Sequence, residues 1–341
     1  MRLIKKVLNV GRRLIFKIPR FEKNALRPLT LRDFSGYNQP FHPSVIYVED
    51  GLFGYKYWMV QTPYPIGGLP YRARWECPCI YWSNDGINWG TGKNNNPIDD
   101  LNSTEIENGD YFSDPHLVYR DDTKELECWY RITHMDRTQK EKKMQYPTYL
   151  VRKTSKDGRN WSKRELLMDF QSSKSLDAMV RSPSIIWDSD RKTYRMWYVD
   201  TLPTLANRNI IYAESNDAHN WAKKTTIALE HYIDPWHIDV NYFDGKYHLI
   251  NYTLTGNRGI NYYESDDGIN FKFIRELLRP SILYINSFYR AQLYRSCSVK
   301  AHDGVRVYFS ASDGISTFIG VMRGSNFKDL RVIDASGLNN L

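Results

Sequence analysis

Four copies of one short motif dominate the sequence and restrict the folds that it can adopt. Each copy has Ser, then Asp two positions later, then Gly or Ala, Asn and an aromatic residue, and the copies lie at 83–89, 155–161, 215–221 and 265–271. Ser and Asp side chains in such a segment bind nearby backbone amides, while glycine provides a positive φ. The copies start 72, 60 and 50 residues apart, and a degenerate fifth lies at 324–327. This spacing indicates a structural unit repeated several times.

A second repeat lies upstream of each turn. It combines a strand that begins with polar residues, a polar turn and an aromatic-rich strand, at 42–60, 114–130, 182–198, 236–252 and 295–309. Units of four antiparallel strands repeated around an axis are typical of propeller blades. We therefore predict an all-β fold, a five-bladed β-propeller over residues 37–336, with blades starting near residues 42, 114, 182, 237 and 296.

The positive charge is concentrated at the N-terminus. Residues 1–32 contain ten of the 47 Lys and Arg residues and one of the 39 Asp and Glu residues, so this leader carries +9 and the remainder −1. A nucleic-acid-binding protein would spread basic residues over its folded face, so the balanced body argues against that class.

The leader also has a helical pattern. Apolar residues recur every three or four positions from Leu3 to Ile18, basic residues lie between them, and Pro19 ends the pattern. This predicts a short basic amphipathic helix, and we expect residues 2–20 to bind an anionic membrane surface. The alternative is a helix docked on its own domain.

The sequence predicts a cytoplasmic location, including the inner face of the membrane. Charges interrupt each apolar stretch near the N-terminus, and no small-residue cleavage site follows, so we expect no export signal. The four cysteines, Cys77, Cys79, Cys128 and Cys297, form no two-pair metal pattern. We expect them to be free buried thiols in a reducing compartment.

The first strand of each blade should line the axis, and its start should rim one mouth of the ring. Polar residues occupy these starts where a structural strand would carry Val or Ile: His42, Asp114, His116, Arg181, Ser182, His237, Asp239 and Arg295. The loops over the same mouth add Tyr64, Arg74, Trp75 and Glu76. Aromatic rings, arginines and carboxylates around a pocket suit a sugar ligand. The alternative is that the polar groups bind one another and water along the axis.

These repeats resemble those of the five-bladed glycoside hydrolases. Five blades, Asp-box-like turns and strand starts such as Asp114-Pro115-His116 are similar to families 43, 32 and 130. The resemblance covers about residues 37–336 and implies the propeller fold and action on glycosidic bonds. In family 43 the first-blade strand start is an Asp that acts as base, and a Glu two blades on is the acid. This chain has His42, Ser182 and Asp239 at the first, third and fourth starts, so the triad does not carry over residue by residue.

The chemistry predicted for the mouth is acid–base catalysis. We expect Asp114 and Asp239 to act as base or transition-state stabiliser and Glu76 as acid, because glycosidic hydrolysis requires a pair of carboxyl groups. The residues expected to bind the substrate or shuttle protons are His42, His116, Arg181, Ser182, His237, Arg295, Arg74, Trp75 and Tyr64. No cofactor is expected. Three histidines near acids leave a divalent metal as the alternative.

Three functional classes are compatible with these features. The first is a carbohydrate-active protein that acts on a glycosidic bond of an oligo- or polysaccharide in the central pocket. The second is a membrane-peripheral glycosyltransferase or tailoring enzyme of surface polysaccharide synthesis. The third is a non-catalytic glycan-binding propeller. The absent family triad argues against an ordinary secreted family 43 enzyme.

Overall fold

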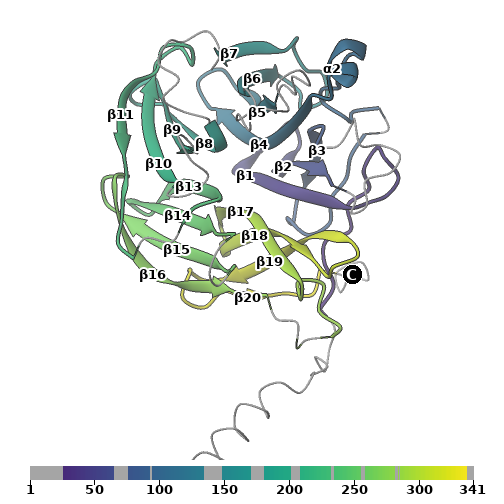
Figure 1. Cartoon of the computed structure of the whole chain (residues 1–341), viewed down its shortest axis with the longest axis vertical. Helices are drawn as coiled ribbons and strands as arrows, with labels where there is room; N and C mark the ends of the chain where they lie inside the picture. Colours follow the sequence, from purple (N-terminus) through teal and green to yellow (C-terminus); the bar gives the residue numbers. More distant parts are fainter. Residues whose placement is uncertain are drawn as a thin grey trace, which may run out of the picture.

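The computed structural model describes residues 26–64, 76–92, 94–133, 148–169, 180–200, 208–231, 234–254, 258–280, 283 and 285–335. Within these residues the chain forms five antiparallel sheets arranged around a central axis (Figure 1), which confirms the predicted five-bladed propeller. The predicted leader helix at residues 2–20 lies outside the described residues. Among the described residues, no helix is long and apolar enough to cross a bilayer.

Each blade is a sheet of strands that follow one another in the chain. Blade one contains β1 (Pro40–Leu52), β2 (Tyr55–Pro63) and β3 (Cys79–Ser83). Blade two contains β4 (Tyr111–Arg120), β5 (Glu125–Thr133), β6 (Thr148–Ser155) and β7 (Glu165–Asp169). Blade three contains β8 (Val180–Asp188), β9 (Thr193–Asp200), β10 (Asn209–Ser215) and β11 (Ala222–Thr226).

The remaining blades follow the same plan. Blade four contains β13 (His237–Phe243), β14 (Lys246–Tyr252), β15 (Ile260–Ser265) and β16 (Asn270–Leu278), and the short β12 (Ala228–Leu229) pairs with β16 in parallel. Blade five contains β17 (Gln292–Ala301), β18 (Gly304–Ser312), β19 (Thr317–Gly324) and β20 (Arg331–Val332). The described helix α2 (Ser103–Asn108) precedes blade two and begins at a capping box formed by Asn102 and Glu105.

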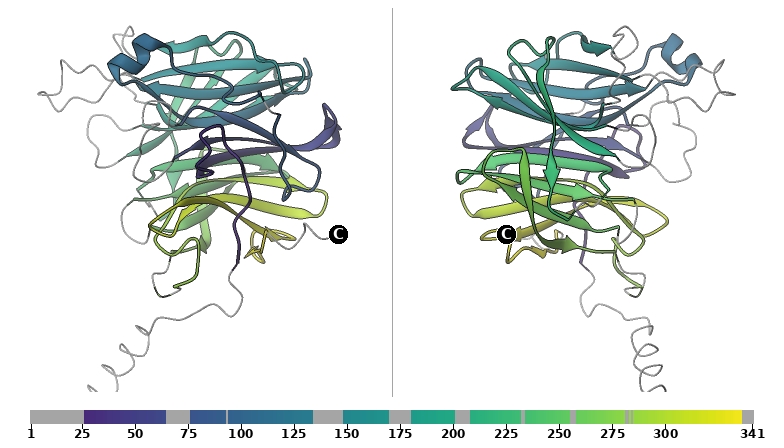
Figure 2. Two further views of the ribbon diagram at one scale, coloured as in Figure 1. Left: turned by 90° about the vertical axis from the view of Figure 1, so that its right-hand side faces the viewer. Right: turned by 60° about the vertical axis from the view of Figure 1, so that its left-hand side comes forward.

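The innermost strands form a closed ring. β1 contacts β4, β4 contacts β8, β8 contacts β13, β13 contacts β17, and β17 contacts β1 again. These five strands surround the centre of the view in Figure 1, and Figure 2 shows the same sheets from the side. Side chains at the start of these strands, though distant in sequence, can therefore share one central site.

The end of the basic N-terminal segment helps to close the ring. The backbone N–H of Leu29 donates to the carbonyl of Ile319 in β19, at 2.9 Å, and the N–H of Ala335 donates to the carbonyl of Arg27, at 3.1 Å. Leu29 and Leu31 are buried in the core shared by blades one and five. The last residues of the 1–32 segment therefore pack within the propeller.

The repeated turns have the expected hydrogen bonds. Asp85 Oδ1 accepts from the backbone N–H groups of Ile87 and Asn88, both at 2.8 Å, and Ser83 Oγ accepts from the N–H of Gly86 at 2.9 Å. Asp157, Asp217 and Asp267 each accept the equivalent pair of backbone bonds. These hydrogen bonds therefore stabilise the turn that follows the third strand of each of these four blades.

β-Bulges direct polar side chains at the start of three inner strands. His42, Asp114 and Ser182 have φ values of 51°, 53° and 47°, and each precedes a proline. The register with the second strand of the blade shifts at the same points in β1, β4 and β8. A bulge of this kind turns a side chain out of the regular alternation of the strand. It places functional groups where a regular strand would not.

Candidate active site at the centre of the ring

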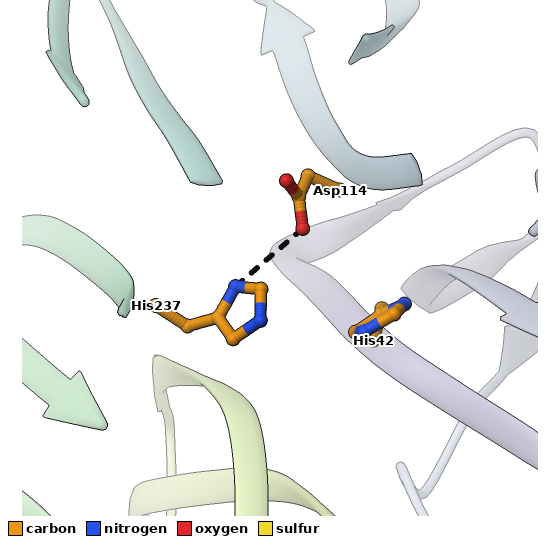
Figure 3. A group of neighbouring side chains, drawn as sticks. All are labelled: His42, Asp114 and His237. Carbon is orange, nitrogen blue, oxygen red and sulfur yellow. Dashed lines mark ion pairs between the residues drawn. The ribbon is translucent and has the colours of Figure 1, made fainter. Parts of the chain in front are cut away.

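Three polar side chains from three blades meet near the axis. Figure 3 shows His42, Asp114 and His237 pointing toward one another, and the Nδ1 atom of His237 lies 3.4 Å from Oδ1 of Asp114. One ligand atom of each residue lies within 4.8 Å of the others. The three residues are 3%, 1% and 5% exposed, respectively. The structure thus brings together three residues that the sequence places far apart.

Asp114 is held in its ionised form. Its Oδ2 accepts from Nε of Arg131 at 2.7 Å and from the backbone N–H of Ser182 at 3.1 Å, and Nη1 of Arg295 lies 3.7 Å from Oδ1. Burial acts to raise the pKa of Asp114, but the Arg131 guanidinium and its other cationic neighbours hold that pKa well below its usual range. A buried carboxylate paired in this way keeps its charge.

Arg131 was not among the residues expected from the sequence. It lies in the aromatic-rich second strand of blade two, after Cys128, Trp129 and Tyr130, and its side chain is buried against Asp114. A charged residue at an inward position of such a strand was the available signal. Recognising its role required knowing that the bulge at Asp114 turns the carboxylate toward it.

Glu76 lies beside these three residues, and its pKa is shifted in the opposite direction to that of Asp114. Its Oε2 is 3.6 Å from Nδ1 of His42, and the residue is 8% exposed. Burial, and to a smaller extent the negative charge of Asp114, raise the pKa of Glu76 to about 8 against the opposing effect of Arg131. Glu76 is therefore a carboxylic acid at neutral pH and can donate a proton.

Both central histidines are neutral and leave ring nitrogens available. Burial lowers the pKa of His42 to about 3 and that of His237 well below its usual value. Nδ1 of His42 is 3.0 Å from Oγ1 of Thr62, but its Nε2 has no hydrogen-bond partner among the described residues. Neither ring nitrogen of His237 makes a hydrogen bond within the described residues, although its Nδ1 lies 3.4 Å from Oδ1 of Asp114. Buried nitrogens without partners are rare in folded proteins and point to a ligand.

Other predicted residues bind neighbouring inner strands instead. Nε2 of His116 lies 3.0 Å from both the N and O of Ile185, and Oγ of Ser182 binds the backbone of Ile238. Oδ2 of Asp239 accepts from the N–H of Ser298 at 2.9 Å and from Nδ2 of Asn241 at 2.9 Å. Burial raises the pKa of Asp239 to about 6, although the Ser298 bond opposes this. For His116, Ser182 and Asp239 the contacts fit the alternative stated above, in which polar groups at the strand starts bind groups of the protein itself.

Aromatic and cationic groups flank the central cluster. Nε1 of Trp236 donates to the hydroxyl of Tyr294 at 2.6 Å, and the Tyr294 ring lies 4.3 Å from that of His237. The guanidinium of Arg181 lies 5.0 Å from the centroid of the Trp236 ring. The Tyr64 ring lies 6.0 Å from that of His42. Arg74 and Trp75 lie outside the described residues.

Arg295 is almost fully buried beside the cluster. It is 1% exposed, and its Nη2 donates to the carbonyl of Pro183 at 3.2 Å. Burial lowers the pKa of Arg295, and Asp114 and Asp239 oppose that effect. Because Asp114 and Asp239 both act on its charge, Arg295 contributes to the charge balance of the site, and it does not reach an exposed surface.

The donor atoms at the centre also fit a divalent cation. Two imidazole nitrogens and one carboxylate oxygen are a common partial ligand set, and other positions would then remain for substrate or water. Arg131 holds Oδ2 of Asp114, as outer groups often do for a ligating carboxylate, and leaves Oδ1 directed toward His237. Arg295, 3.7 Å from that Oδ1, opposes a cation there. His42, Asp114 and His237 thus offer three ligand atoms to a metal, and Arg295 is the charge that works against its binding.

Comparison with known proteins gives similarity at the level of structure. No family model and no curated protein matches the chain. The chain is similar to an N-acetylgalactosamine deacetylase from F. plautii, solved in complex with blood group B trisaccharide, at a TM-score of 0.68 and 19% identity over 89% of this chain and 94% of that one.

Two further solved structures have the same architecture. One is the GH43_1 enzyme from Xanthomonas citri complexed with xylotriose, with a TM-score of 0.58 and 10% identity over 92% of this chain and 94% of that one. The other is the exo-β-1,3-galactanase from Phanerochaete chrysosporium with β-1,3-galactotriose, with a TM-score of 0.56 and 13% identity over 91% and 66%.

The chain therefore shares its fold with these three enzymes. The resemblance to glycoside hydrolases expected from the sequence is therefore confirmed for the fold. At these identities the similarity carries no residue roles, so the chemistry of this chain has to be argued from its own central cluster.

Proposed function

We propose that the protein is a carbohydrate-active hydrolase that cleaves a glycosidic bond of an oligo- or polysaccharide at the centre of the propeller. One observation carries this proposal: Glu76 and Asp114 meet around His42 with their pKa values displaced in opposite directions. Two carboxyl groups separated in this way are suited to the roles of proton donor and anion. The oligosaccharides named with the structurally similar enzymes support the same substrate class.

The roles follow from protonation. Glu76 carries a proton near neutral pH and would deliver it to the oxygen of the departing sugar, so that no alkoxide has to form. Asp114 keeps its charge and would stabilise the cationic sugar ring of the transition state or accept a proton from attacking water. His42, placed between the two, would orient the substrate through its unpaired Nε2.

The surroundings suit a sugar. A connected group of aromatic side chains lies near the cluster: Trp236 is hydrogen-bonded to Tyr294, and Phe41 stacks on both Tyr294 and Tyr64. Aromatic faces pack against the C–H groups of a pyranose, while buried polar groups bind its hydroxyls. Asp239 has its hydrogen bonds within the inner strands, so we assign the catalytic carboxyl roles to Glu76 and Asp114 alone.

The proposal is tested by hydrolysis of a panel of xylo-, galacto- and manno-oligosaccharides with wild-type protein and two variants. Glu76→Gln and Asp114→Asn should each lower turnover by roughly 10²–10⁴-fold, the usual contribution of a positioned acid or base. Asp244→Asn, which changes an exposed turn carboxylate, is the control. Because Asp114→Asn removes a buried charge, its fold is checked by circular dichroism. Wild-type turnover in a folded Glu76→Gln variant would rule out the assigned acid.

A second candidate is removal of an N-acetyl group from an amino sugar. It is favoured by the convergence of His42, Asp114 and His237, and the structural similarity to a deacetylase supports it. A divalent ion bound by these three residues would supply Lewis-acid activation of water or of the amide carbonyl. Glu76, next to His42, would then move the proton between water and the leaving amine.

Product analysis separates the two candidates. Incubation with N-acetylated oligosaccharides should release reducing ends under the first proposal and acetate from an intact chain under the second. Pre-treatment with a chelator, followed by addition of Zn²⁺ or Mn²⁺, should change only the second reaction. Binding of either ion to wild-type protein but not to His237→Ala, measured by calorimetry, would support the metal site independently of activity.

We also propose that residues 2–20 attach the protein to an anionic membrane surface at the cytoplasmic face. The support is the sequence pattern of basic and apolar residues in this leader. Co-sedimentation with vesicles of phosphatidylglycerol and phosphatidylcholine should fall when residues 1–20 are deleted and when salt is raised. Equal sedimentation of both proteins would contradict the proposal.

A further inference from the structure

Two arginines share one tryptophan at the edge of the central cluster. The guanidinium carbon of Arg181 lies 5.0 Å from the centroid of the Trp236 ring, and that of Arg208 lies 4.8 Å from it. We infer that the saccharide bound at the centre carries an anionic group, a carboxylate, sulfate or phosphate, that Arg181 binds beside Trp236. This inference deepens the proposed function, since it names the class of substrate for the same pocket.

The charges around Trp236 are not balanced. Arg208 donates from Nε and Nη2 to the two carboxylate oxygens of Asp234, with an Nε–Oδ1 distance of 3.1 Å. Arg181 has no ion pair with any described acidic residue, and its buried Nε has no hydrogen-bond partner among the described residues. Among the charged groups around Arg181, the repulsion by Arg131 is stronger than the attraction by Asp114, whose carboxylate is already paired with Arg131. A second cation next to the same ring therefore lacks the anion that would neutralise it.

The other partly buried arginines that stack on tryptophan each have a carboxylate partner, which Arg181 lacks among the described residues. Arg120 over Trp187 binds Asp122, and Arg152 over Trp129 binds Glu165 with Nη2 at 2.8 Å. Arg195 near Trp197 lies 3.7 Å from Asp188. Each has a carboxylate within the structure, as expected for a cation removed from water. Among these side chains Arg181 is the exception, and it is the one that lies at the candidate active site.

The position of Arg181 matches a substrate contact. Trp236 is hydrogen-bonded to Tyr294, whose ring lies 4.3 Å from that of His237 and 5.4 Å from that of His42. An anion on Arg181 would thus be separated from the proposed reacting groups by two aromatic side chains, Trp236 and Tyr294. That separation fits a substituent on the sugar and not the bond being cleaved. The planar guanidinium can bind a carboxylate, sulfate or phosphate through two parallel hydrogen bonds.

The test measures binding, so that it does not depend on turnover. Glu76→Gln protein is titrated with trigalacturonate, with its methyl ester, which has the same skeleton without charge, and with inorganic sulfate and phosphate. The full-length protein is used, and the quenching of tryptophan fluorescence and calorimetry both report binding. We expect the charged trisaccharide to bind at least about tenfold more tightly than its ester, with an advantage that decreases as salt is raised.

Variants assign the contact. Adding Arg181→Gln to the Glu76→Gln protein should remove the preference for the charged trisaccharide. Adding Arg181→Lys should retain part of that preference, since lysine keeps the charge but cannot donate two parallel hydrogen bonds. The control is Arg159→Gln, which changes an exposed arginine 5.5 Å from the Trp82 ring on an outer turn and should leave the preference intact. Tighter binding by sulfate or phosphate than by trigalacturonate would assign the anion to an ester substituent instead of a uronic acid.

The outcomes distinguish this inference from the proposed function. Equal affinity for trigalacturonate and its ester, with no binding of inorganic sulfate or phosphate, would overturn the inference. So would a charge preference that persists in Arg181→Gln. A charge preference that depends on Arg181, found together with failure of wild-type protein to hydrolyse either the neutral panel or trigalacturonate, would overturn only the hydrolase proposal.

Discussion

Nδ1 of His237 lies 3.4 Å from Oδ1 of Asp114, although the two residues begin strands of non-adjacent blades. The contact exists only because the inner strands close into a ring, so that blades two and four face each other across the axis. The central cluster therefore depends on the whole propeller. Changes that loosen the ring should alter the site even when they lie far from it.

Removing the partner of Asp114 should strongly destabilise the protein. Arg131→Met keeps much of the side-chain volume but leaves a buried carboxylate whose closest cation is gone. Breaking such a pair typically lowers the free energy of unfolding by about 3–5 kcal/mol, and the effect should appear in urea denaturation. Arg279→Met, which breaks an exposed pair with Glu276, should change it by less than about 1 kcal/mol. Similar losses in both variants would contradict a buried, ionised Asp114.

The raised pKa of Glu76 predicts a pH-dependent contribution to stability. Burial raises the pKa of Glu76 in the folded state to about 8 from 4.5, so the folded protein holds a proton that the unfolded chain releases. Its contribution is therefore present below pH 4.5 and is lost as the pH rises through about 8. The slope cannot exceed about 1.4 kcal/mol per pH unit for a single proton.

Comparison with Glu76→Gln isolates this effect from other titrations. The difference in unfolding free energy, wild type minus variant, should fall between about pH 5 and about pH 8 in urea titrations. Hydrolysis by the wild type should also fall as the pH rises through about 8, because the acid loses its proton. A difference that stays constant over this range would show that Glu76 is ionised in the folded protein.

The repeats predicted the fold well because the information for a propeller is local. Ser83, Asp85 and Gly86 specify a turn through bonds to residues two or three positions away, and the other copies of the motif do the same. The polar strand starts at His42 and Asp114 were also recognisable, since each interrupts an apolar strand before a proline. The turn motifs and the polar strand starts can be recognised in the sequence without knowing which strands are neighbours in the folded protein.

The partners of the strand-start residues could not be predicted in the same way. Asp239 and Asp114 occupy similar places in the repeat, yet Asp114 sits on a bulge and faces the axis, while Asp239 lies in a regular stretch of β13 and binds Ser298 of the next inner strand. His116, two residues after Asp114, binds Ile185 of the adjacent strand. The alternation of residues along a strand predicts which face of the sheet a side chain is on. It does not predict whether that side chain points to the propeller axis or binds the inner strand of the neighbouring blade.

The glycine of the second turn motif should be intolerant of substitution. Gly158 has φ of 70°, and a Cβ built there would lie 2.3 Å from the Trp58 ring of the adjacent blade. Gly158→Ala therefore combines backbone strain with a clash against a fully buried indole, and overpacking in a core commonly lowers stability by about 1–3 kcal/mol. Gly54→Ala is a useful control, because its φ is also positive, at 90°, but it has no neighbour within 4 Å. Equal melting temperatures for the two variants would show that the blades can separate enough to admit the methyl group.

The segment from Arg27 to Leu31 should contribute to closure of the ring. Leu29 is 4% exposed in the core between blades one and five, and its backbone binds β19. Leu29→Ala should lower the free energy of unfolding by about 2–5 kcal/mol, the usual effect of removing a buried leucine side chain. A chain that starts at residue 33 should lose more of this free energy of unfolding, because the backbone bonds to Ile319 and Ala335 are lost as well.

The matched control is a chain that starts at residue 26, which keeps every one of these contacts. Differential scanning calorimetry compares the three proteins, and a chain starting at residue 33 that melts at the same temperature as the control would show that the blades close without this segment.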